Sequence, residues 1–181
     1  MVTKNQTAKR LDLINVLWDI QKKRRYISKD DIAKISVEFN ISKVELEGVI
    51  SFYHFFHFKD AGKYTIYLNN SIASEHRNYN EVKQAFEGEL GIKIGTVTKD
   101  KMFGLFTTSC VGLSDQESSA LINFYPFTNL TAKKVKTIIT KIKEGLTLES
   151  LSDYPEDNIL YRPNEDQRTI FFKPHVLGQG L

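Results

Sequence analysis

The chain has a single cysteine, Cys110, and this residue is the first candidate for chemistry. It stands between Ser109 and Val111, in a polar stretch that follows an apolar, strand-like segment. One cysteine excludes a Cys-x-x-Cys dithiol and an internal disulfide, and no histidine lies near it in the sequence to activate it. We therefore interpret Cys110 as a structural or bystander residue. A free-standing thiol enzyme that uses it is the weakest of the hypotheses kept open.

The other patterns that could do chemistry are incomplete. His54 and His57 are three residues apart and could sit on neighbouring helical turns, but no further ligand follows nearby, so we expect packing or surface roles. The sequence has no Walker loop and no GxGxxG motif, and no pair of carboxylates stands out for acid–base work. The residues alone therefore favour no catalytic site, and any enzymatic role would belong to a larger complex.

Composition limits the class of protein. The 181 residues and 20.8 kDa fit one domain, or one domain with a small helical annex. A net charge of +3 falls short of the concentrated positive charge of a nucleic-acid binder, so we expect no nucleic-acid partner. Asp12, Asn15 and Asp19 interrupt the apolar residues of the N-terminus, which argues against a signal peptide and direct membrane insertion. A single thiol fits the reduced cytoplasm.

The first third of the chain predicts a helical annex. Apolar residues recur at helical spacing over residues 8–25, and Ser28 and Ser42 are placed to cap a second and a third helix. The basic run at residues 22–25 suits a solvated helix end, with a docking patch for an acidic partner as the alternative. The third helix is expected to continue through an aromatic run, which needs either two covering layers or a partner protein. The run comprises Phe52, Tyr53, Phe55, Phe56 and Phe58.

The middle of the chain predicts a small open α/β sheet. Alternating patterns indicate strands at residues 63–68, 102–107 and 119–125, and helices are expected after Asn80 and after Thr131. A helix between the first two strands predicts a parallel crossover, and the close spacing of the last two predicts a hairpin. We expect a thioredoxin-like arrangement with three parts: an N-terminal three-helix annex at 1–60, the α/β domain at 61–150, and an irregular tail or linker at 151–181.

Four motifs carry a family resemblance: SFYHFF, GKYTIYL, FGLF and CVGLSDQE. Through them the chain resembles the N-terminal thioredoxin-like domain of the diaphorase (flavin) subunit of NAD-reducing [NiFe] hydrogenases. It is also similar to the related small thioredoxin-like [2Fe-2S] subunit of respiratory complex I. The likeness covers residues 8–150. The segment from Thr169 to Leu181 is similar to the point where that flavin subunit continues into its next domain.

The resemblance implies a cluster site, and this sequence departs from it. In the iron–sulfur members four cysteines hold a [2Fe-2S] cluster, because each iron completes its tetrahedron with two thiolates. The corresponding positions here are Asn69 and Ser74 after the first strand, and Cys110 and Ser114 after the later one. Three of the four thiolates are missing, so we expect a degenerate, empty site and no cofactor in this chain.

The function implied by the resemblance is an accessory or assembly module of an NADH-oxidising diaphorase, in an NAD-reducing hydrogenase or a complex-I-like assembly. It would dock on the flavin subunit, which holds FMN, iron–sulfur clusters and the NAD site. The candidate interface is the set Phe52, Tyr53, Phe55 and Phe56. Exposed aromatic surface could also make the isolated chain dimerise. The alternative is a [2Fe-2S] electron-relay protein that retains a labile cluster.

Overall fold

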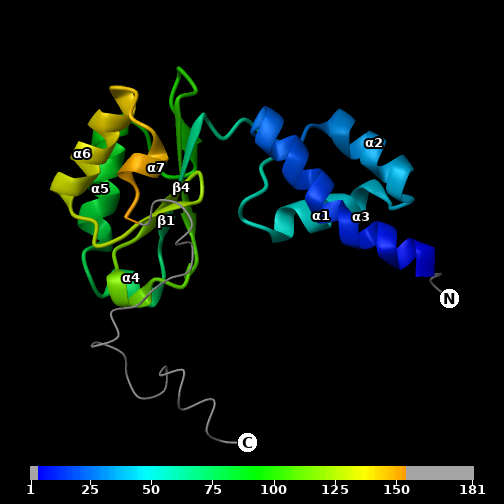
Figure 1. Ribbon diagram of the computed structural model, residues 1–181, viewed down its shortest axis with the longest axis horizontal. Helices are drawn as coiled ribbons and strands as arrows, with labels where there is room; N and C mark the ends of the chain where they lie inside the picture. Colours follow the sequence, from blue (N-terminus) through cyan, green and yellow to red (C-terminus); the bar gives the residue numbers. More distant parts are fainter. Residues whose placement is uncertain (1–3, 154–181) are drawn as a thin grey trace, which may run out of the picture.

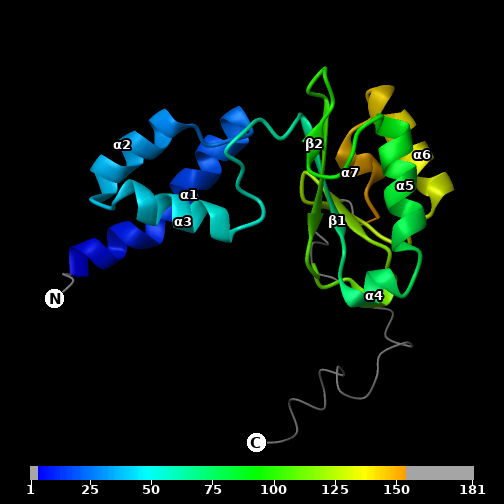
Figure 2. The same ribbon diagram turned by 180° about the vertical axis from the view of Figure 1, so that it is seen from behind.

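The computed structural model describes residues 4–153, and the side chains from residue 12 onward. Three N-terminal helices stand beside a mixed sheet whose other side is covered by α5 and α6 (Figures 1 and 2). The helices are α1 (Lys4–Arg24), α2 (Lys29–Phe39), α3 (Lys43–Phe52), α4 (Ile72–Glu75), α5 (Tyr79–Leu90), α6 (Ala132–Lys143) and α7 (Leu148–Leu151), with a 3-10 turn η1 (Ser114–Gln116). The strands are β1 (Tyr64–Asn69), β2 (Thr96–Val97), β3 (Phe103–Thr108), β4 (Ala120–Ile122) and β5 (Tyr125–Phe127).

The helices α2 and α3 begin where their capping residues predict. The Ser28 hydroxyl accepts a hydrogen bond from Asp31 N at 3.1 Å, and the Asp31 carboxylate accepts one from Ser28 N at 3.0 Å, which completes a capping box. Asn40 ends α2 in the left-handed conformation, and Ser42 caps α3. The annex core is apolar: Leu13, Leu17, Ile27, Ile32, Ile35, Ile41, Leu46, Ile50 and Phe56.

The aromatic run does not continue the third helix, so this prediction was wrong. α3 ends at Phe52, and Tyr53 has the extended backbone of φ −95° and ψ 118°. Leaving the helix lets the following rings point to different neighbours: Phe56 packs on Trp18 of α1, and Phe55 packs on Tyr67 of β1, each with ring centroids 5.0 Å apart. An uninterrupted apolar run gives no stop signal in the sequence, because the helix ends through tertiary contacts.

The sheet has the order β2-β3-β1-β4-β5. β1 and β3 pair in parallel, with α5 in the connection between them, so the predicted crossover is confirmed. The predicted hairpin between the second and third strands was wrong, because β1 lies between β3 and β4. The segment 119–125 instead bends at Asn123 and Phe124, and the hairpin is formed by β4 and β5. β2 was not among the expected strands, and it pairs antiparallel with β3.

The two faces of β1 contact different parts of the molecule. Ile66 and Leu68 belong to the core beneath α5 and α6, whereas Tyr67 contacts rings of the segment that follows α3. This alternation is the period-two pattern of a strand that is covered on both faces. The sheet core and the annex core share no residue. We propose from this that the division of the chain falls near residue 60, as the sequence predicts.

The junction between annex and sheet is tight at one backbone position. A Cβ added at Gly104 of β3 would collide with the carbonyl oxygen of Ala61, and Gly62 has a positive φ of 86°. Glycine is required at both places because the connecting segment crosses β3 at backbone contact distance. The helix α7 ends at Leu151, and residues 154–181 of the predicted tail lie outside the described residues.

Candidate functional site: the degenerate cluster loops

The four predicted cluster positions lie at or after the carboxyl ends of two strands: Asn69 ends β1, Ser74 lies in α4, Cys110 follows β3 and Ser114 begins η1. β1 and β3 are parallel, and their last residues, Asn69 and Thr108, are register partners. Asn70 N donates to Thr108 O at 3.0 Å, and Asn69 N donates to Ser119 O at 3.0 Å. The carboxyl ends of parallel strands are the usual place for a site in an open α/β sheet. Figure 1 shows α4 at this end of the sheet.

Asn69 is fully buried and both ends of its amide are used. Its Nδ2 donates to Glu117 Oε1, and its Oδ1 accepts from Ser71 N at 2.9 Å. The amide therefore ties the loop after β1 to the segment before β4, 48 residues away along the chain. A buried amide is tolerated at this position because its hydrogen bonds are made within the protein.

Glu117 is the centre of this arrangement, and it was not predicted from the sequence. Its side chain is buried, with 5% of the residue exposed, and its Oε2 accepts from Ser119 N at 2.8 Å and from Ser119 Oγ at 3.1 Å. Burial raises the pKa of Glu117, while hydrogen bonds from Ser119, Ser74 and Asn69 act in the opposite direction. The one signal available beforehand was an isolated acidic residue placed directly before a buried strand.

Ser74 extends the buried network to the start of α5. Its Oγ donates to Ser118 Oγ at 3.4 Å, and Ser118 Oγ donates to Asn78 Oδ1 at 2.9 Å. Asn78 Nδ2 in turn donates to Leu130 O at 2.8 Å. Both positions of the first predicted ligand pair are thus buried and hydrogen-bonded to the segment 117–119 and its neighbours.

The second predicted pair is exposed. Cys110 Sγ lies 3.1 Å from Ser114 Oγ, and Gly112 N donates to the same sulfur at 3.4 Å. Both residues lie on the surface, Cys110 on the loop after β3 and Ser114 at the start of η1. The structure therefore brings the two members of this pair together, in water rather than in a closed site.

These residues do not fit a [2Fe-2S] cluster. The cluster needs soft anionic ligands on both irons, and a chain with one cysteine offers one thiolate. Asn69 and Ser74 could not turn toward a cluster without leaving their partners, which would strand buried polar groups. Within residues 12–153, moreover, no group of three or more His, Cys, Asp or Glu side chains is placed to hold a metal ion.

The predicted interface residues differ in exposure. Phe52 is 75% exposed and Tyr53 is 42% exposed, and their rings meet edge-on with centroids 5.1 Å apart. Phe55 is half-buried, and Phe56 is 7% exposed in the annex core. An available docking surface in this run therefore consists of Phe52 and Tyr53.

The histidines have packing and surface positions, as expected. His54 is exposed, whereas His57 is half-buried and its Nε2 lies 2.7 Å from Tyr67 Oη. Burial lowers the pKa of His57 to about 4, so the ring is neutral at neutral pH. It therefore serves as a hydrogen-bonding partner between the segment after α3 and β1.

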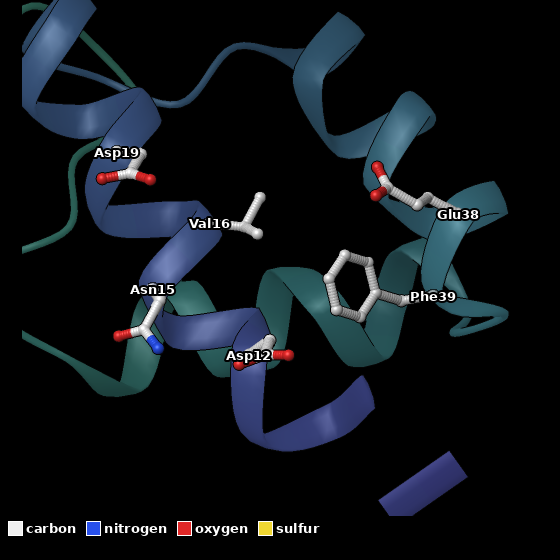
Figure 3. Close-up of a pocket in the computed structure, with 6 residues that line it drawn as sticks. All are labelled: Asp12, Asn15, Val16, Asp19, Glu38 and Phe39. Atoms are coloured by element: carbon white, nitrogen blue, oxygen red, sulfur yellow. The ribbon is translucent and has the colours of Figure 1, made fainter. Parts of the chain in front are cut away.

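A hollow in the annex lies apart from the cluster loops. Figure 3 shows it between α1 and α2, with Val16 and Phe39 facing each other across it. Its lining is Asp12, Asn15, Val16, Asp19, Glu38 and Phe39. No residue of the hollow belongs to the cluster loops, and we assign no chemistry to it.

No described helix is long and apolar enough to span a membrane.

Two known proteins are similar to this chain in sequence. The chain is 36% identical over 174 residues to the NAD-reducing hydrogenase HoxS subunit alpha of Cupriavidus necator, which covers 94% of this chain and 29% of the relative. It is 31% identical over 130 residues to an NADH-quinone oxidoreductase subunit of Buchnera aphidicola, covering 72% of this chain and 80% of that protein.

Solved structures point the same way. The crystal structure of an NAD⁺-reducing [NiFe]-hydrogenase in the air-oxidized state matches 76% of this chain with a TM-score of 0.65 and 27% identity. This chain spans 24% of that hydrogenase chain and under a third of the HoxS subunit. Residues 1–143 match the model of the family described as thioredoxin-like [2Fe-2S] ferredoxin. The chain has a thioredoxin-like α/β fold, and it belongs to this family.

Proposed function

We propose that this chain is an accessory or assembly module of an NAD(H)-linked oxidoreductase, either an NAD-reducing hydrogenase or a complex-I-like assembly. It docks on the flavin subunit, which carries FMN, NAD and iron–sulfur clusters, and it acts in the cytoplasm. The observation that carries the proposal is a family match over residues 1–143 in a chain whose one cysteine can supply one of the four thiolates that a cluster needs. A chain that has the family fold without the cluster thiolates is suited to binding a partner protein and poorly suited to electron transfer.

The docking surface is proposed to include Phe52 and Tyr53. Large exposed aromatic side chains are enriched at protein interfaces, and these two rings are adjacent at the end of α3. Phe52→Asp together with Tyr53→Asp should abolish co-purification with a co-expressed flavin subunit. Val37→Asp is the matched control, because Val37 is an 83% exposed apolar residue on α2. Undiminished binding of the folded double variant would remove this surface from the proposal.

The alternative function is electron relay through a labile [2Fe-2S] cluster. The proximity of Cys110 and Ser114 on one exposed loop is the observation that favours it. Iron and acid-labile sulfide should be measured on protein made and purified without oxygen. We expect neither above background. Iron and sulfide in the amounts of one cluster per chain, with a visible absorption band, would replace the docking proposal by the relay.

A further inference from the structure

The turn between β4 and β5 has an unusual residue at its second position. Ile122 pairs with Tyr125, and the two residues between them, Asn123 and Phe124, have positive φ angles of 46° and 71°. Two-residue hairpin turns of this kind favour Asn-Gly, because Asn and Gly tolerate the left-handed region. Asn123 fits its place, but a bulky ring at the glycine position is a source of backbone strain.

The strain is not offset by burial in a core. Phe124 is 45% exposed and belongs to neither core. Its ring instead contacts three other rings, with centroid distances of 5.1 Å to Trp18, 5.1 Å to Phe55 and 5.9 Å to Tyr67. These rings come from α1, from the segment after α3 and from β1. The turn therefore places one ring where the annex, the connection and the sheet meet.

Among the described residues, the junction also has a ring contact between His57 and Phe106, with centroids 4.5 Å apart, and polar contacts that are partly solvated. Asp60 of the connecting segment pairs with Arg25 of the annex at 3.2 Å and with Lys101 before β3 at 3.7 Å. His57 and Tyr67 share the hydrogen bond described above. Exposed ion pairs contribute little to holding two bodies in one orientation. The orientation of the annex thus depends on the aromatic contacts, and Phe124 is the residue through which the β4–β5 turn joins them.

We propose that Phe124 is a conformational pin, which the β4–β5 turn holds against Trp18 to fix the annex on the sheet. Its function is to keep the annex surface with Phe52 and Tyr53 in one orientation relative to the cluster loops. This role of Phe124 concerns contacts within this chain alone, so it can be tested independently of the identity of the docking partner.

Phe124→Gly tests the pin, because it removes the ring and relieves the turn at once. Trp18 is the one tryptophan of the chain, so its fluorescence reports the junction directly. We expect a red-shifted Trp18 emission, stronger acrylamide quenching and a larger radius of gyration in X-ray scattering. The far-UV circular dichroism should stay unchanged, because glycine adopts the turn conformation freely.

Two further variants separate ring loss from other effects. Phe124→Asn also removes the ring and tolerates a positive φ, so it should reproduce the Trp18 shift. Phe58→Ala is the matched control: Phe58 is likewise 45% exposed, and it has no ring contact among the described residues. Trp18 emission should not change in that variant.

Three results would overturn the pin. The first is a folded Phe124→Gly protein with unchanged emission, quenching and radius of gyration. The second is the same Trp18 shift in Phe58→Ala, which would show a general loss of order. The third is failure of both Phe124 variants to fold, since a pin between two separate cores is dispensable to each core.

Discussion

The two loops that carry the predicted cluster positions hold their polar side chains in different surroundings. In the loop after β1, Asn69 and Ser74 are fully buried, and both side chains are hydrogen-bonded to the segment that contains Glu117. In the loop after β3, Cys110 and Ser114 are exposed and contact each other. A buried polar group without a partner costs about 1–3 kcal/mol, whereas an exposed one is hydrated. Replacing a buried ligand therefore requires a complete set of new partners, and replacing an exposed one does not.

Removing the carboxylate at the centre of the buried loop should have the largest effect. Glu117→Ala leaves the Asn69 amide and the Ser119 N–H buried without their acceptor. We expect the free energy of unfolding to fall by about 2–4 kcal/mol, which urea titration followed by circular dichroism would measure. The exposed Glu47→Ala is the control and should stay within about 0.5 kcal/mol of the wild type. A loss below about 1 kcal/mol would mean that water replaces the carboxylate, and the buried loop would then resemble the exposed one.

Single substitutions to cysteine should have the next largest effect, and their effect on the unfolding free energy should differ between the two loops. Asn69→Cys removes the donor to Glu117 and the acceptor for Ser71 N, so we expect a loss of about 1–3 kcal/mol. Ser114→Cys changes an exposed hydroxyl to a thiol and should stay within about 0.5 kcal/mol of the wild type. Both are measured by the same urea titration under reducing conditions. An equal loss of unfolding free energy in Asn69→Cys and Ser114→Cys would show that the two loops do not differ in this way.

This difference between the loops could not be predicted from the sequence. The four predicted cluster positions are implied by the family resemblance, and in the structure they lie at or after the carboxyl ends of β1 and β3. Glu117 is different, because its partner Asn69 lies 48 residues away and no local pattern links the two. Whether a polar substitute is buried and satisfied is a tertiary property, which a single sequence does not encode locally.

The fold shows the same division between local and non-local signals. Ser28 and Ser42 predict the starts of α2 and α3 because capping depends on nearby backbone groups. The end of α3 and the β4–β5 turn were missed because they depend on distant rings. Phe124 in particular replaces the glycine that would have marked the turn, and its contacts with Trp18 and Phe55 lie far away along the chain.

The smallest expected effect is a pH dependence confined to the buried loop. Because the pKa of Glu117 is raised in the folded state, the native protein binds more protons than the unfolded chain above the usual pKa of a glutamate. Stability from this group is therefore present at low pH and decreases as pH rises through the folded pKa. Glu117→Gln removes that titration. The unfolding free energy of the wild type minus that of the variant should fall as the pH rises above about 4.5, the usual pKa of a glutamate.

His57 makes this difference measurement necessary, because it titrates with the opposite sign. Its pKa is lowered to about 4, so the unfolded chain binds more protons between about pH 4 and about pH 6.5, and stability from His57 rises with pH there. The same slope is present in the wild type and in Glu117→Gln, and it cancels when one is subtracted from the other. A difference that stays flat would show that the Asn69 and Ser119 hydrogen bonds balance the desolvation of the carboxylate, and one that rises with pH would show that they outweigh it. In the second case Glu117 would be a stabilised anion, and the loop after β1 would hold a fixed negative charge at the predicted cluster positions.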